Sequence, residues 1–163
     1  MDKKLILKKG IKKGIFFLSV IVPVIYFLSN FFTINRTASL PTGLYFMHSF
    51  SKLEKGDVVV FLPVKEAKNY LPKNTKYMMK NIGGVKGDKI KIVDDRLYIN
   101  DEDFGEVFKQ DITGKKLPRY NGAEIKEDEV FLVTKAKGSF DSRYWGTLKK
   151  DKIQKKAILI IKF

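Results

Sequence analysis

The feature that most constrains the fold of this chain is a long apolar run close to its N-terminus. Residues 14–34 carry no charged side chain, and most of them are Ile, Val, Leu, Phe or Tyr. About 20 helical residues are enough to cross the ~30 Å hydrocarbon core of a bilayer. Pro23 lies inside the run, and proline is tolerated in membrane helices. The run therefore predicts a transmembrane helix over residues 14–34, followed by a folded domain over residues 35–163.

The charges on either side of the run predict how the helix is oriented. Six lysines lie within residues 1–13, whereas Arg36 is the charge close to the other end. Cytoplasmic flanks of membrane helices are enriched in lysine and arginine. We therefore expect a single-pass membrane protein with residues 1–13 in the cytoplasm and the domain on the other side. In a bacterium this would be the inner (cytoplasmic) membrane, with the domain periplasmic or otherwise extracytoplasmic. A cleaved secretory signal peptide also begins with basic residues, but the length of the run favours an uncleaved anchor.

The composition excludes several classes of site. The chain has no cysteine and one histidine, His48, which excludes disulfides, thiolate metal sites, cysteine nucleophiles and multi-histidine metal sites. We expect no cofactor or metal, and we place His48 in a loop or at a strand edge. The net charge of +14 comes from lysines scattered among acidic residues. This pattern is typical of a solvated surface that can face anionic lipids, and no nucleic-acid partner is expected.

The domain beyond the run has the patterns of short strands and turns. Asp94-Asp95 separates two alternating segments and predicts the turn of a hairpin. The polar residues 102–127 predict an insertion or long loop, and residues 65–77 a short helix or lid-like loop. Strands are expected over residues 57–62, 89–93, 96–100, 129–134 and 157–161. The predicted fold class is mainly β, an antiparallel barrel-like or sandwich-like domain on one N-terminal transmembrane helix.

A serine and a lysine in the domain suggest hydrolytic chemistry without histidine. Ser39 lies soon after the apolar run, and Lys80 lies in the segment Met78-Met79-Lys80-Asn81. A serine hydroxyl needs a base to accept its proton. A lysine amine can serve only when it is neutral, so its pKa, ordinarily near 10.4, must be lowered by burial in an apolar site. A lone lysine is usually a solvated surface charge, although the neighbouring methionines suit an apolar pocket.

The order of four motifs along the chain resembles the bacterial type I signal peptidase family of Ser-Lys proteases. The motifs are S-L-P-T-G-L-Y at 39–45, G-D-V-V-V at 56–60, Lys80 followed by Gly87-Asp88, and S-F-D-S-R-Y-W-G at 139–146. The S-x-P-x-G-x-Y form is most similar to the conjugative-transfer (TraF-type) branch. Asn81 after the lysine, residues 135–138 and Leu40 after the serine differ from the housekeeping branch.

The resemblance implies a role for each matching residue. Ser39 would be the nucleophile and Lys80 the general base. The backbone N–H of Ser39 and the hydroxyl of Thr37 would stabilise the oxyanion. Supporting positions fall on Ser139, Asp141 and Arg143, with Ser139 orienting the lysine amine and Asp141 paired with Arg143.

The implied function is that of a membrane-anchored serine endopeptidase that cleaves signal peptides or pilin-like precursors. Its partners would be membrane-tethered precursor proteins or signal peptides as substrates, and the lipid bilayer. The proline and glycine after Ser39 favour a link to conjugation over general secretion. One alternative is a non-catalytic membrane-anchored β domain that acts as an assembly or binding module. Another is a self-cleaving relative of the LexA type, against which the anchor argues.

Three smaller features complete the predictions. Asn35-Arg36-Thr37 fits a glycosylation sequon, which we interpret as coincidental so close to the bilayer. Gly83 and Gly84 predict a tight turn or a close backbone approach near Lys80. Tyr144 and Trp145 are assigned to packing or to the membrane interface.

Overall fold

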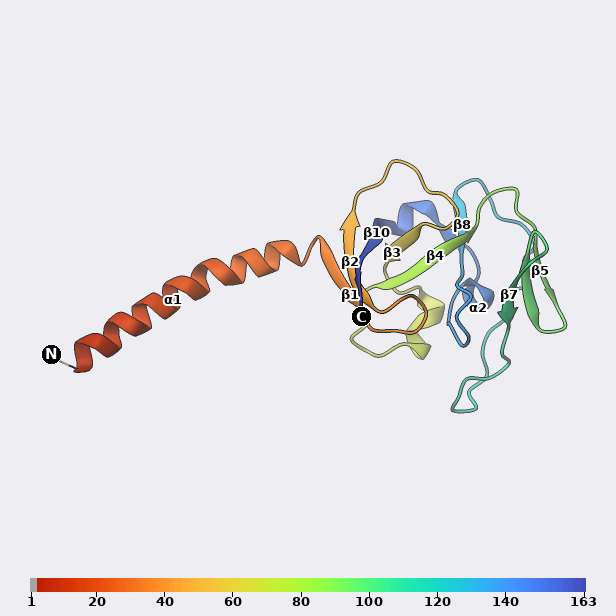
Figure 1. The fold of residues 1–163 in the computed structure, drawn as a ribbon. Coiled ribbons are helices and arrows are strands. Elements are labelled where there is room, and N and C mark those ends of the chain that lie inside the picture. The colour runs from red at the N-terminus through yellow and green to blue at the C-terminus, as the bar shows by residue number, and fades with distance from the viewer. Residues whose placement is uncertain (1–2) are drawn as a thin grey trace.

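A long N-terminal helix projects from a compact β domain (Figure 1). The computed structural model describes residues 3–163, so Met1 and Asp2 of the predicted cytoplasmic segment lie outside the described residues. Helix α1 spans Lys3–Leu28. Its stretch Ile11–Leu28 is long and apolar enough to cross a membrane by length and composition, and none of that stretch is buried against the domain. This exposure suits a helix whose apolar side chains meet lipid rather than a protein core.

The helix ends at Leu28, whereas the sequence predicted a helix to Ile34. Residues Phe32–Asn35 form strand β1, which pairs with β2 in antiparallel register. The prediction was wrong here because an apolar run alone does not separate a helix from a strand. The last part of the run thus belongs to the β domain and joins the helix directly to its sheet.

The larger sheet has seven antiparallel strands in the order β1-β2-β10-β3-β4-β8-β9. The last strand of the chain, β10, lies between β2 and β3, so the C-terminus lies beside the start of the domain (Figure 1). The strands span β1 Phe32–Asn35, β2 Gly43–His48, β3 Val58–Phe61, β4 Met78–Gly84, β8 Glu129–Leu132, β9 Leu148–Lys149 and β10 Ile153–Lys162. Strands far apart in the sequence therefore bring the N-terminal and central motifs into one sheet.

The smaller sheet has three strands, β5 Ile90–Val93, β6 Arg96–Ile99 and β7 Glu102–Glu106. Asp94 and Asp95 have φ angles of 46° and 57°, which is the left-handed conformation of a two-residue type I′ hairpin turn. The predicted hairpin is thus confirmed. The predicted loop at 102–127 begins instead with β7, which continues the sheet through a second tight turn. Val107 and Ile125 from the rest of this region are buried in the core.

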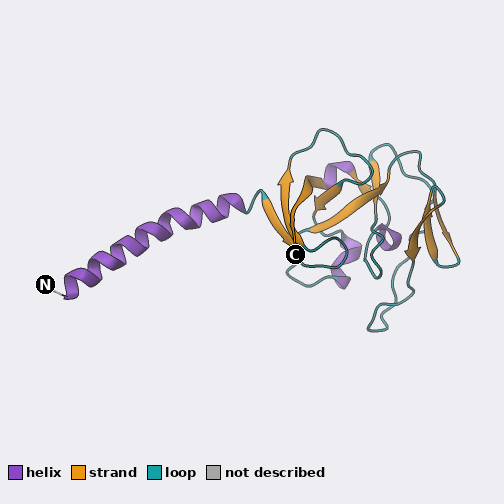
Figure 2. Cartoon of the chain, viewed as in Figure 1, coloured by secondary structure: helices purple, strands orange, loops and turns teal. Residues whose placement is uncertain are grey.

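Three short helices complete the domain (Figure 2), and the buried apolar residues of the described chain form three core clusters, of which two are larger. The 3₁₀ helix η1 spans Lys65–Tyr70, within the segment expected to hold a short helix. Helix α2 spans Ser142–Trp145, and the 3₁₀ helix η2 spans Lys150–Lys152. Phe140 and Trp145 pack against both main core clusters. The segment that carries the last motif is therefore held in the centre of the domain.

The fold class agrees with the prediction. The domain is mainly antiparallel β and follows one N-terminal apolar helix. The strand order does not close the larger sheet into a barrel, because β1 and β9 stand at its two ends. The arrangement is therefore sandwich-like, with the three-stranded sheet beside the larger one (Figure 2).

Candidate active site

Ser39 lies in the loop that joins β1 to β2, and the motif around it fixes the shape of that loop. Tyr45 is buried, and its hydroxyl donates a hydrogen bond to the Pro41 carbonyl oxygen at 2.9 Å. A Cβ at Gly43 would lie 2.1 Å from the Ile161 carbonyl oxygen. The close approach of β10 therefore leaves room only for glycine at this position. Leu40 is buried beneath the loop. The proline, glycine and tyrosine of the motif thus hold Ser39 at the edge of the sheet, where it is half-buried.

Lys80 lies in the middle of β4 and points inward. Alternate residues of this strand are buried, so Lys80 shares its face with Met78 and Ile82, and it is only 6% exposed. Its amine donates a hydrogen bond to the Ser139 hydroxyl at 3.1 Å. Burial lowers the pKa of Lys80 from its ordinary value, with a smaller opposing effect from Asp141 and a lowering effect from Arg143. A lowered pKa raises the fraction of neutral amine, which is the form that can accept a proton.

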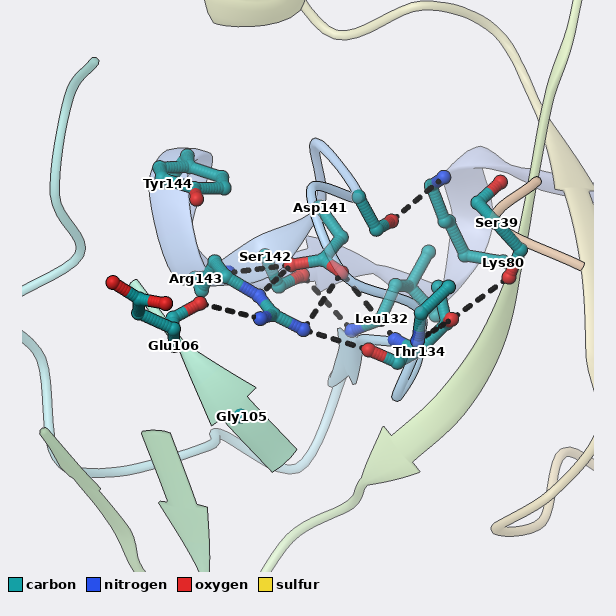
Figure 3. Close-up of polar contacts among 12 residues, drawn as sticks. Ser39, Lys80, Gly105, Glu106, Leu132, Thr134, Asp141, Ser142, Arg143 and Tyr144 are labelled. Atoms are coloured by element: carbon teal, nitrogen blue, oxygen red, sulfur yellow. Dashed lines mark hydrogen bonds and ion pairs between the residues drawn. The ribbon is translucent and has the colours of Figure 1, made fainter. Parts of the chain in front are cut away.

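The structure brings Ser39 and Lys80 to the same cavity. Both residues line a cavity of about 480 Å³, together with Thr37 and Ser139. Figure 3 shows the Ser39 side chain beside the Lys80 amine, on the side opposite the Asp141 carboxylate. The Thr37 hydroxyl lies 3.1 Å from the Ser39 hydroxyl. The Ser39 hydroxyl, the buried Lys80 amine, the Ser139 hydroxyl that accepts from that amine and the Thr37 hydroxyl therefore converge on one open space.

Asp141 and Arg143 form a buried ion pair behind this cavity (Figure 3). The Arg143 Nε donates to Asp141 Oδ1 at 2.8 Å, and its second terminal nitrogen donates to Asp141 Oδ2 at 3.2 Å. Arg143 also donates to the backbone oxygens of Glu106 and Thr134 at 2.8 and 2.7 Å. Burial raises the pKa of the Asp141 carboxyl, and the Arg143 guanidinium opposes that rise. The pair ties the loop after β8 to the end of β7.

Thr134 connects the ion pair to the loop of Ser39, and nothing in the sequence singled it out. Its hydroxyl donates to the Ser39 carbonyl oxygen at 2.7 Å, and its backbone N–H donates to Asp141 Oδ2 at 3.3 Å. Its own carbonyl oxygen accepts from Arg143. A threonine at the end of an apolar strand gives no signal of such a role, because the contact joins residues far apart in the chain. Asn35, considered only as part of a sequon, is a second missed residue and is buried beside Thr37.

The remaining predicted residues have structural roles. A Cβ at Gly83 would lie 2.3 Å from the Val133 side chain, so the predicted close approach is confirmed. Tyr144 is buried, and its hydroxyl accepts the Phe108 backbone N–H at 3.1 Å. His48 ends β2, with its Nδ1 2.7 Å from the Ser49 carbonyl oxygen. Within residues 3–163, no cluster of His, Asp or Glu is arranged to hold a metal ion.

Comparison with known proteins shows the family to which the chain belongs. Residues 7–162 match the family described as signal peptidase, peptidase S26. A plasmid transfer protein TraF of Escherichia coli is 32% identical over 138 residues, which cover 74% of this chain and 77% of that protein. A signal peptidase I of Leptolyngbya laminosa is 26% identical over 115 residues, or 69% of this chain and 54% of that protein. A solved signal peptidase I from Enterococcus faecalis V583 aligns with a TM-score of 0.43 and 23% identity, over 66% of this chain and 98% of that one. Because the family match spans almost the whole chain, the protein belongs to the signal peptidase family, peptidase S26, and is similar to its TraF branch.

Proposed function

We propose that this member of the signal peptidase family is a membrane-anchored serine endopeptidase in which Ser39 is the nucleophile and Lys80 the general base. The observation that carries the proposal is the burial of the Lys80 amine at the cavity that Ser39 also lines. Burial of a lysine costs free energy, because it disfavours the charged form of the amine. Strongly perturbed ionisable groups that face a cleft are typical of catalytic sites.

The proposed reaction uses these residues in two steps. The neutral Lys80 amine takes the proton from the Ser39 hydroxyl as Oγ attacks the carbonyl carbon of the scissile peptide bond. The Ser39 N–H and the Thr37 hydroxyl donate to the resulting oxyanion, each worth about 3–4 kcal/mol. The Lys80 ammonium then gives its proton to the leaving amine, and an ester remains on Ser39. A water activated by Lys80 hydrolyses that ester and frees the serine.

Two residue groups would support this chemistry. Ser139, which accepts a hydrogen bond from the Lys80 amine, would direct its lone pair towards Ser39. The Asp141–Arg143 pair would hold the loop that carries Ser139, since Asp141 is two residues beyond it. Both groups would act by fixing geometry rather than by touching the substrate.

The substrates in this proposal are precursor proteins tethered to the same membrane. Helix α1 would anchor the enzyme in the bacterial inner membrane, with residues 1–13 in the cytoplasm and residues 35–163 outside it. A cleavage site that follows a membrane segment of the precursor would then reach the cavity of Ser39 at the lipid boundary. The similarity to a plasmid transfer protein supports pilin-like precursors linked to conjugation, and the similarity to signal peptidase I supports secretory signal peptides.

The test is cleavage by the detergent-solubilised full-length chain. A secretory precursor with a signal peptide and a pilin-like precursor are incubated separately, and mass spectrometry identifies the new termini. We expect one new cut in at least one precursor, just after small side chains, and no cut with Ser39→Ala. Equal products from the wild type and from Ser39→Ala, or no product from either precursor, would favour a non-catalytic anchored module.

A further inference from the structure

The side chain of Asn35 is the centre of the hydrogen bonds that shape the Ser39 loop. Asn35 is the last residue of β1 and pairs with Gly43, the first residue of β2, so it lies at the base of the loop between them. It is 8% exposed. Its amide nitrogen lies 2.9, 2.9 and 3.1 Å from the carbonyl oxygens of Thr37, Leu40 and Pro41. One amide thus holds the loop closed from within, on both sides of Ser39.

The carbonyl end of the same amide takes both hydrogens that Thr37 can donate. Asn35 Oδ1 accepts the Thr37 backbone N–H at 3.2 Å and the Thr37 hydroxyl at 2.8 Å. A hydroxyl has one hydrogen and two lone pairs. While that hydrogen is given to Asn35, the Thr37 oxygen can only accept from the Ser39 hydroxyl, which lies 3.1 Å away. The contacts therefore define a chain of hydrogen bonds that runs from Ser39 through Thr37 to Asn35.

We propose that Asn35 is a positioning residue that aims the Thr37 hydroxyl, an inference that rests on the proposed peptidase function. Before attack, Asn35 holds the Thr37 hydrogen and leaves an acceptor facing Ser39. When Lys80 takes the Ser39 proton, the Thr37 oxygen no longer accepts a hydrogen bond from Ser39. The Thr37 hydroxyl then rotates and donates its hydrogen to the oxyanion. Asn35 Oδ1 still accepts the Thr37 backbone N–H after this rotation, so the buried amide oxygen is not left without a hydrogen bond.

The same contacts exclude a role for the sequon. A glycosylated asparagine presents its amide nitrogen to solvent, whereas here that nitrogen faces three backbone carbonyls inside the loop. The asparagine and threonine of Asn35-Arg36-Thr37 are instead two partners in one hydrogen-bond network. Arg36, between them, is exposed.

A double-mutant cycle tests whether Asn35 acts through Thr37. The variants Asn35→Ala, Thr37→Val and the double variant are assayed as full-length protein on a precursor that the wild type cuts. We expect Asn35→Ala to lower kcat about 100-fold with KM changed less than about threefold, and to lower it about tenfold or less when Thr37 is already valine. Asn74→Ala, which removes an exposed asparagine, should leave kcat within about twofold of the wild type.

Equal losses from Asn35→Ala in both backgrounds, or an unchanged kcat, would overturn the proposal. If Asn35→Ala does not fold, as judged by circular dichroism, Asn35→Asp provides the second variant. Its carboxylate keeps the size of the side chain but places a negative charge beside the forming oxyanion, so a folded Asn35→Asp protein with wild-type kcat would also overturn it. If Ser39→Ala abolishes cleavage but the effects of Asn35→Ala and Thr37→Val are additive, only the role of Asn35 is refuted. A wild type without activity refutes the peptidase function and this role with it.

Discussion

Replacing Ser39 by alanine is expected to lower kcat/KM for precursor cleavage by at least about a thousandfold, while the domain stays folded. The side chain lost is small and half-buried at a loop, so its removal leaves no large cavity in the core. The variant lacks the oxygen that we propose attacks the peptide bond. The assay is product formation by quantitative mass spectrometry, with circular dichroism to verify the fold.

Replacing Lys80 by methionine should have a similar effect on kcat/KM, because the apolar side chain fits among Met78 and Ile82 but cannot accept a proton. The matched controls are Ser51→Ala and Lys76→Met, which change the same residue types at exposed positions. Both controls should remain within about twofold of the wild type. Retention of more than about a tenth of the wild-type kcat/KM by either Ser39→Ala or Lys80→Met would contradict a two-residue mechanism.

Arg143→Ala is expected to lower the free energy of unfolding by about 3–5 kcal/mol, because it leaves the Asp141 carboxylate buried without its counter-charge. It also removes the donors to the carbonyl oxygens of Glu106 and Thr134. The measurement is denaturant unfolding of the solubilised protein, followed by tryptophan fluorescence at Trp145. Activity should fall as well, since the ion pair and Thr134 connect to the Ser39 loop.

An exposed ion pair provides the control for this prediction. Lys52 and Glu54 lie 2.8 Å apart on the surface, and exposed pairs of this kind contribute little. Lys52→Ala should therefore leave the free energy of unfolding close to that of the wild type. An Arg143→Ala protein as stable as Lys52→Ala would show that the buried pair does not support the domain.

The parts of the fold that were predicted from the sequence are those with local signals. The Asp94-Asp95 turn and the strands beside it follow from alternation and from a residue type that tolerates left-handed backbone. Strand β4 was missed, because a lysine and two glycines interrupt its apolar pattern and are depleted in strands. These residues suit the strand only because the Ser139 hydroxyl accepts a hydrogen bond from the Lys80 amine and the Val133 side chain packs tightly over Gly83.

The residues of the candidate site were predicted from sequence motifs. The contacts that shape the site could not be predicted from the sequence. Ser39, Lys80 and the segment from Ser139 to Arg143 were chosen by resemblance, and the structure brings them to one region. Asn35 and Thr134 were not chosen, because their contacts depend on how the loop of Ser39 closes and on where β8 ends. Local sequence carries no information on a hydroxyl that binds a carbonyl 95 residues away.

Titration of Lys80 by NMR is the sharpest test of whether this residue has a neutral amine available to Ser39. Lysines labelled at the carbon next to the amine are followed against pH in the solubilised protein, and the spectrum of Lys80→Met identifies the signal of Lys80. We expect the Lys80 signal to titrate below the ordinary lysine pKa near 10.4, because burial disfavours the charged amine. Cleavage should rise as the pH increases through that lowered pKa. A Lys80 signal that titrates together with those of the exposed lysines would rule out Lys80 as the general base.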